Sequence, residues 1–106
     1  MVLAIKDKST FDSKISENEL VVVDFSAVWC GPCKAIAPEF EKLSEIYSNV
    51  TFLKVDGDEN PELTKEYEIS AYPTFLFFKG GKQEVDRKVI GASKSKLEEA
   101  LKNLTQ

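Results

Sequence analysis

No histidine occurs among the 106 residues, and there are only two cysteines. The lack of histidine excludes the Ser/His and Cys/His catalytic pairs and removes the commonest metal ligand. A zinc site would have to add carboxylates to the two cysteines, because no other good ligand is left. Metal binding is thus one alternative for the cysteines. Proton transfer in any reaction falls to carboxylates, lysines or the thiols themselves.

The chain also lacks an excess of basic residues and any long hydrophobic run. Its net charge is −4 and its pI is about 4.9, so neither nucleic acid nor a membrane surface is an expected partner. No stretch approaches the roughly 20 apolar residues of a membrane-spanning helix. The apolar segment Met1–Ile5 is too short for a signal peptide, and Lys6-Asp7-Lys8 follows it at once. We therefore expect a cytoplasmic protein, in a compartment where structural disulfides seldom persist.

Both cysteines lie in one pentapeptide, Trp29-Cys30-Gly31-Pro32-Cys33, directly after an apolar run and at the start of a helical pattern. Two thiols in the first turn of a helix can close a disulfide, and one of them can be activated as a thiolate. This arrangement is typical of a dithiol redox enzyme. A purely structural disulfide is the other alternative, but so short a loop would stabilise the fold by only about 2 kcal/mol.

The length predicts a single domain over residues 1–106, and 42% of the residues are hydrophobic, as in a globular chain. Hydrophobic patterning predicts five strands, at Val2–Ile5, Leu20–Phe25, Thr51–Val55, Thr74–Phe78 and Glu84–Ile90. A Gly-Gly pair at 80–81 predicts a hairpin, so the last two strands should be antiparallel.

Three of the expected helices carry N-terminal capping signals. Ser9 with Asp12, and Ser95 with Glu98, resemble capping boxes that open the first and the last helix. Asn60 is the expected cap of a short helix.

The longest amphipathic pattern covers Pro32–Tyr47, with Pro32 at the first helical position. Pro38 lies inside this pattern and predicts a kink, with a break at Ala37 as the alternative. The order of elements predicts an α/β fold: a mixed five-stranded sheet with helices on both faces.

Four segments stand in one order and spacing along the chain: Val22-Val23-Asp24-Phe25, Trp29-Cys30-Gly31-Pro32-Cys33-Lys34, Tyr72-Pro73-Thr74 and Ile90-Gly91-Ala92. Together with the order of elements, they resemble the thioredoxin family over essentially the whole chain. The resemblance implies a monomeric protein-disulfide reductase without a cofactor, which keeps protein thiols reduced and supplies electrons to reductive enzymes. The partners it implies are thioredoxin reductase and disulfide-containing clients such as peroxiredoxins, methionine sulfoxide reductase and ribonucleotide reductase.

The expected mechanism begins with Cys30, whose thiolate is favoured by the amides and the dipole at a helix N-terminus. Cys30 would attack the substrate disulfide, and Cys33 would resolve the mixed disulfide. In the absence of histidine, Asp24 is the nearest nameable base for Cys33, since burial in an apolar strand raises the pKa of a carboxyl. Its alternative role is to cap a turn or helix. Lys54 matches the lysine that neighbours this acid in the family, or is an ordinary solvent-facing lysine.

The resemblance also implies a shallow docking surface and a cis peptide bond between Tyr72 and Pro73. We expect eight residues in this surface: Trp29, Gly31, Pro32, Tyr72, Pro73, Ile90, Gly91 and Ala92. An extended substrate segment would pair with the backbone beside Pro73. As alternatives, Trp29 is a core or cap aromatic, and Gly91 is a plain turn or bulge glycine.

Three positions depart from common family patterns and bear on the choice of partner. Ser26 stands where an aromatic is frequent, Val28 where a polar residue is frequent, and Tyr72 where an aliphatic residue or methionine usually precedes the proline. Two rival functions remain: a disulfide oxidase or isomerase of the secretory pathway, and a non-catalytic scaffold. Gly31-Pro32 between the cysteines resembles the reducing members of the family.

Overall fold

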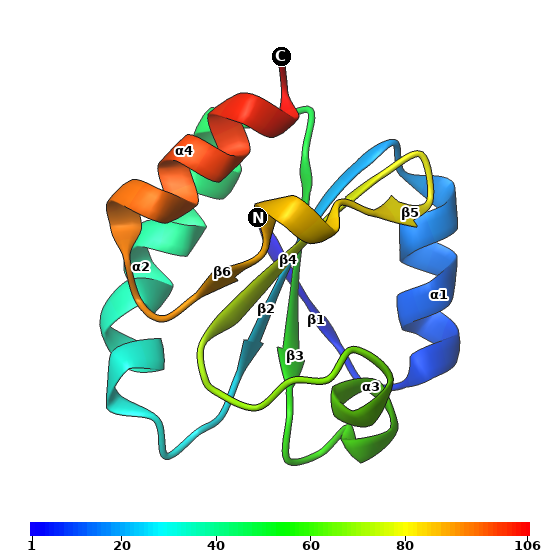
Figure 1. Cartoon of the computed structure of the whole chain (residues 1–106), viewed down its shortest axis with the longest axis vertical. Helices are drawn as coiled ribbons and strands as arrows, with labels where there is room; N and C mark the ends of the chain where they lie inside the picture. The colour runs from blue at the N-terminus through cyan, green and yellow to red at the C-terminus, as the bar shows by residue number, and fades with distance from the viewer.

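A computed structural model describes residues 1–106. Strands and helices alternate along most of the chain, as Figure 1 shows. The elements are β1 (Val2–Ile5), α1 (Lys8–Glu17), β2 (Leu20–Ser26), α2 (Gly31–Ile46), β3 (Thr51–Asp56), α3 (Pro61–Glu66), β4 (Thr74–Lys79), β5 (Lys82–Gln83), the 3₁₀ helix η1 (Val85–Arg87), β6 (Val89–Ile90) and α4 (Lys94–Leu104). None of the helices is both long enough and apolar enough to cross a membrane.

The strands form one mixed sheet in the order β1-β3-β2-β4-β5, and β6 pairs with the beginning of β4, whereas β5 pairs with its end. The first three strands are parallel, with β3 between β1 and β2. The hairpin strand β4 runs antiparallel to β2, β5 and β6. The predicted mixed α/β sheet with an antiparallel final part is therefore confirmed, and β2 lies at its centre.

Helices cover both faces of this sheet, α2 and α4 on one side and α1 and α3 on the other (Figure 1). Alternation along β2 divides its side chains between two hydrophobic clusters. Val22 packs with α2 and α4, whereas Val21 and Val23 pack with α1 and α3. Asp24 has the same parity as Val22, so the strand directs it to the α2 face.

The expected fifth strand, Glu84–Ile90, is wrong as one element. Only its last two residues form a strand, β6, after the 3₁₀ helix η1, while β5 lies before Glu84, which gives six strands in place of five. The segment 84–88 contains one apolar residue, Val85, and that side chain is 65% exposed. With no buried side chain to hold it on the sheet, this stretch leaves the ladder after two pairs with β4.

Several predicted helix starts also need correction. The N-cap of α1 is Asp7, not Ser9, because the Thr10 amide donates to the Asp7 carboxylate at 2.8 Å. The N-cap of α4 is Ser93, not Ser95, with the Lys96 amide as donor. In both helices two residues that can cap stand close together, and the earlier one does so.

Near the other two helix starts, the expected caps differ in their hydrogen bonds and positions. Asn60 is the N-cap of α3 by position, but its side-chain amide donates to the Asp56 carbonyl. Helix α2 begins at Gly31, one residue before the expected Pro32, and runs unbroken through Pro38, so the alternative break at Ala37 is wrong.

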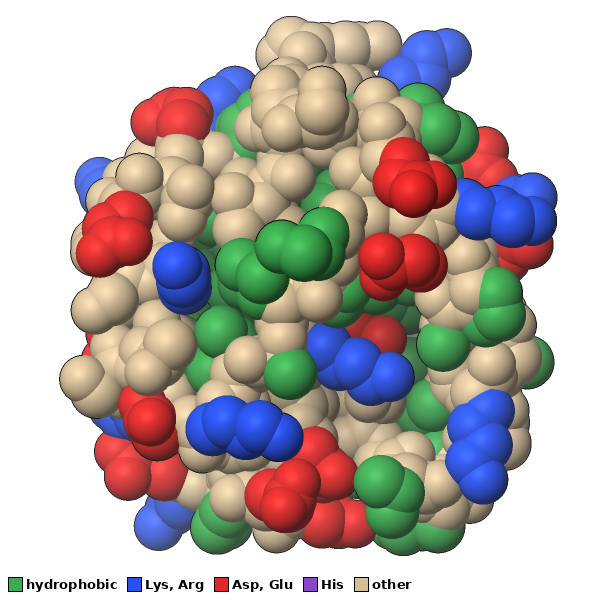
Figure 2. Space-filling model, turned by 180° about the vertical axis from the view of Figure 1, so that it is seen from behind, with side chains coloured by type: hydrophobic (Ala, Val, Ile, Leu, Met, Phe, Trp, Pro, Cys, Tyr) green, Lys and Arg blue, Asp and Glu red, His purple; other side chains and the backbone are tan.

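Charged side chains of both signs are interspersed over most of the face shown in Figure 2, and a few acidic side chains lie together at its lower edge. This distribution matches the modest net charge of −4.

Candidate active site

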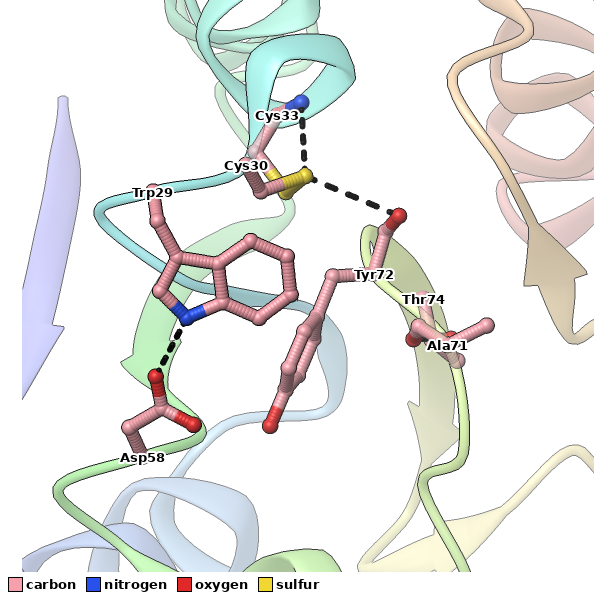
Figure 3. Close-up of a disulfide and its surroundings, with 7 residues drawn as sticks. All are labelled: Trp29, Cys30, Cys33, Asp58, Ala71, Tyr72 and Thr74. Carbon is pink, nitrogen blue, oxygen red and sulfur yellow. Dashed lines mark hydrogen bonds between the residues drawn. A yellow bond between two sulfur atoms is a disulfide. The ribbon is translucent and has the colours of Figure 1, made fainter.

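Cys30 and Cys33 form a disulfide at the start of α2, shown in Figure 3. Their Cα atoms are 5.3 Å apart, and both residues are buried in this oxidised state. Cys30 is the N-cap of α2, with an extended backbone, and its Sγ accepts a hydrogen bond from the Cys33 amide at 3.2 Å. Cys30 therefore directly precedes the first helical residue, Gly31, and the expected helix N-terminus at the cysteine pair is present.

The capping position defines the electrostatics of the Cys30 sulfur. A helix N-terminus presents unpaired amides and the positive end of the helix dipole, and both favour an anion. The Cys30 Sγ also lies 3.7 Å from the Tyr72 carbonyl oxygen, within reach of donation from a reduced thiol (Figure 3). Reduction of the disulfide would therefore leave a sulfur that an amide stabilises as a thiolate.

Trp29 lies on the surface next to this sulfur and is 67% exposed, so the alternative of a core aromatic is wrong. Its indole nitrogen donates to the Asp58 carboxylate at 2.7 Å. The Tyr72 ring contacts the indole edge-to-face, with ring centroids 5.9 Å apart (Figure 3). Sequence reasoning missed Asp58. It follows the end of β3, and the carboxyl ends of neighbouring parallel strands meet at one edge of a sheet, which was the available signal.

The loop before β4 faces the disulfide. The Tyr72–Pro73 peptide bond is cis, as the family resemblance implied. Neither the amide nor the carbonyl of Tyr72 has a backbone hydrogen-bond partner. The Pro73 carbonyl accepts a hydrogen bond from the Gly91 amide at 2.8 Å, while Thr74 pairs with Ile90. The structure therefore brings the 72–74 and 90–91 segments together.

The eight expected docking residues differ in exposure. Ile90 is 57% exposed, Tyr72 and Gly91 are half-buried, and Pro73 is buried. Gly91 has φ +99°, a conformation that other residues rarely adopt. The backbone at this position therefore favours glycine, in keeping with the alternative of a turn glycine. The remaining members are exposed: Trp29, Gly31, Pro32 and Ala92.

Asp24 lies inside β2, directly opposite Lys54 of β3, and its side chain is only 1% exposed. Its Oδ1 has no hydrogen-bond partner, so Asp24 does not act as the cap that was its alternative role. Burial raises the pKa of Asp24 from 3.8 to about 7, and the positive charge of Lys54 opposes that rise. Lys54 itself is exposed.

Two adjoining hollows connect this acid with the dithiol. A groove of about 740 Å³ is lined by Cys33, Lys54 and Ala37, among others. A smaller cavity of about 230 Å³ is lined by Asp24 and again by Lys54 and Ala37. Cys33 therefore faces a space that leads past Lys54 towards Asp24. No group of three or more cysteines and carboxylates is placed to hold a metal ion.

A disulfide at the start of a helix, facing the loop that precedes β4 of a mixed central sheet, is typical of a thiol-disulfide oxidoreductase. The family model described as thioredoxin matches residues 2–103. The chain is 52% identical to the thioredoxin of Equus caballus, covering 98% of this chain and 99% of that one. It is 47% identical to Thioredoxin-1 of Schizosaccharomyces pombe, covering 96% and 97%.

A solved structure of similar fold comes from a study of thiol resolution in a yeast mitochondrial 1-Cys peroxiredoxin through glutathione and thioredoxin systems. It is 39% identical, covers 97% of this chain and 95% of that chain, and has a TM-score of 0.92. The chain belongs to the thioredoxin family. The sequence expectation of a disulfide reductase with a redox-active cysteine pair is confirmed.

Proposed function

We propose that this disulfide reductase uses Cys30 as the attacking thiol and Cys33 as the resolving thiol. The observation that carries this assignment is the hydrogen bond from the Cys33 amide to the Cys30 Sγ. The same amide at the helix start would stabilise a Cys30 thiolate. Cys33 lies inside the helix, and its sulfur is placed to reach Cys30.

The reaction is a two-step exchange. The Cys30 thiolate attacks one sulfur of the substrate disulfide, a mixed disulfide forms, and the other substrate sulfur leaves as a thiolate. The Cys33 thiolate then attacks the Cys30 sulfur and expels the second substrate sulfur. The substrate gains two electrons and the cysteine pair loses two, as it closes into a disulfide. The released thiolates take protons from solvent or from Asp24.

Asp24 is our proposed base for Cys33. Its pKa of about 7 makes it half ionised near neutral pH, which suits proton transfer. The adjoining hollows provide room for a water-mediated path from Cys33 to Asp24. Lys54 borders both hollows and favours the ionised form of Asp24, so we assign it a supporting electrostatic role.

The docking surface is proposed to bind an extended segment of the client protein. The free amide and carbonyl of Tyr72 can pair with such a segment, as an added strand would. Side chains around the disulfide then contact the residues on either side of the client cysteine. The proposed members are Trp29, Gly31, Pro32, Tyr72, Pro73, Ile90, Gly91 and Ala92.

We further infer that residues 1–106 act as one monomeric domain in the cytoplasm, recharged by thioredoxin reductase. The family match over residues 2–103 supports the single domain. Proposed clients are peroxiredoxins, methionine sulfoxide reductase and ribonucleotide reductase. The yeast structure from a peroxiredoxin study supports the first of these. The Gly31-Pro32 pair between the cysteines supports a reducing role. A reduction potential as high as that of protein disulfide isomerase, about −180 mV, would contradict this role.

A trapping experiment tests the two cysteine roles. Cys33→Ser should accumulate a stable mixed disulfide between Cys30 and a client, because the resolving sulfur is gone. Cys30→Ser is the matched control and should trap no client. Equal trapping by both variants would contradict the assignment. If the variant with both cysteines replaced by serine kept its biological activity, a scaffold role would be supported.

A further inference from the structure

Gly57 is a buried glycine in the turn between β3 and α3. Its φ lies outside the left-handed region, so its backbone does not require glycine. The space around it does. A Cβ at this position would overlap three atoms of the Tyr72 ring: the hydroxyl oxygen, Cζ and Cε1. Gly57 and Tyr72 are therefore matched in size, although they are distant in the sequence.

The backbone of Gly57 is held on both sides. Its amide donates to the Ser26 carbonyl at the end of β2 at 2.8 Å. Its carbonyl accepts from the Asn60 amide at 3.3 Å. Because these bonds anchor the turn, a side chain added at Gly57 would displace the far end of the Tyr72 side chain rather than the turn.

The position of the Tyr72 ring matters for the neighbouring indole. The ring packs edge-to-face against Trp29. The Trp29 nitrogen is bound to Asp58, the residue that follows Gly57. In Figure 3 the Tyr72 side chain lies beside the indole and points to the same side as Asp58. The turn 57–58 thus fixes both aromatic side chains, one by leaving room for it and the other by a hydrogen bond.

We propose that Gly57 is a positioning residue for the docking surface. It holds the Tyr72 ring against Trp29 and thereby sets the preference for protein disulfides over small disulfides. This inference rests on the docking surface proposed above. A protein client has to lie across Trp29 and Tyr72, whereas a small disulfide needs only the dithiol.

A mutant cycle tests the proposal with two substrates, insulin and 5,5′-dithiobis(2-nitrobenzoate). Gly57→Ala should raise KM for insulin about three- to tenfold, the range expected for loss of an aromatic pair, with kcat changed less. The rate with the small disulfide should stay within about twofold of wild type. Glu62→Ala, an exposed change in the helix that follows this turn, is the matched control and should leave both substrates unaffected.

The second half of the cycle uses Tyr72→Leu. In that background Gly57→Ala should have no further effect on KM for insulin, because the atoms it would overlap are gone. Fluorescence supplies an independent readout, since Trp29 is the only tryptophan. Gly57→Ala should change its emission in the Tyr72 background and leave it unchanged in the Tyr72→Leu background.

Three results would overturn the proposal: Gly57→Ala acts equally in both backgrounds, it has no effect in either, or it slows the small disulfide as much as insulin. Thermal unfolding shows whether a variant is folded, and the fluorescence comparison is read on folded variants. If Cys30→Ser still reduced insulin, the cysteine roles would fail, but the fluorescence cycle would still decide the role of Gly57.

Discussion

Asp24 of β2 stands directly opposite Lys54 of β3, with the carboxyl buried and the lysine exposed. The strand alternation that buries Val22 also directs Asp24 towards α2, where an apolar side chain would stabilise the fold. The sheet therefore holds a carboxyl whose pKa is raised to about 7 by burial and lowered in part by Lys54.

The first prediction concerns stability and pH. The folded protein binds a proton at Asp24 up to about pH 7, while the unfolded chain releases it near 3.8. Stability should therefore fall as the pH rises from about 4 to about 7, by about 4 kcal/mol in total from this group. Asp24→Asn should remove this loss, and at pH 8 the variant should be more stable than wild type by about 2 to 4 kcal/mol.

Urea unfolding at pH 4 and at pH 8 measures the difference between the two proteins. The gain from Asp24→Asn should be present at pH 8 and nearly absent at pH 4. An equal gain at both pH values would show that the pKa of Asp24 is not raised in the folded protein. Asp86→Asn in η1, an exposed carboxylate without an ion-pair partner, is the control for removal of a carboxylate.

The second prediction isolates Lys54. Because its positive charge lowers the pKa of Asp24, Lys54→Met should raise that pKa further. Carbon-13 NMR titration of the Asp24 carboxyl measures the change directly. Lys102→Met removes a charge from α4 and should leave the titration where it is. A downward shift in Lys54→Met would contradict the electrostatic role of Lys54.

The third prediction concerns the contact between Trp29 and Asp58. Asp58→Ala removes the acceptor of the indole hydrogen bond and should raise KM for insulin about threefold to tenfold. Asp58→Asn retains an oxygen acceptor and should have a smaller effect. Steady-state kinetics with both variants separates loss of the hydrogen bond from loss of charge. If both variants raised KM equally, the charge of Asp58 and not its hydrogen bond would be responsible.

The fourth prediction checks the corrected start of α4. Ser93→Ala removes the side chain that accepts from the Lys96 amide and should destabilise the protein by about 1 kcal/mol. Ser95→Ala lies inside the first turn and should change the free energy of unfolding by much less. Chemical unfolding of the two variants decides between them. The reverse order would restore the cap expected from the sequence.

Much of the fold was predictable because local signals agreed. The run Leu20–Phe25 is apolar almost throughout, as a strand covered on both faces has to be, and the structure places it at the centre of the sheet. The paired cysteines after it predicted a helix start and a redox site, and Cys30 caps α2. Asp24 was identified as a candidate base because a single acid in an apolar strand does not contribute to a hydrophobic core.

The differences arise where contacts distant in sequence decide the outcome. The segment 84–88 lies between two segments that pair with β4, but its one apolar side chain, Val85, is exposed and does not hold it on the sheet. The contact of Gly57 with Tyr72 and the bond from Trp29 to Asp58 join residues separated by more than ten positions. No periodicity or capping rule reports such pairs. The choice between Ser93 and Ser95 was ambiguous because both can cap.

The central claim is that the Cys30 sulfur is held as a thiolate by the amides at the start of α2. Alkylation of the reduced protein by iodoacetamide, followed across a pH series, measures it most directly. We expect Cys30 to be the more reactive thiol and its reactivity to titrate with a pKa below that of free cysteine, which is about 8.5. A Cys30 that titrates like free cysteine, or that reacts more slowly than Cys33, would contradict it.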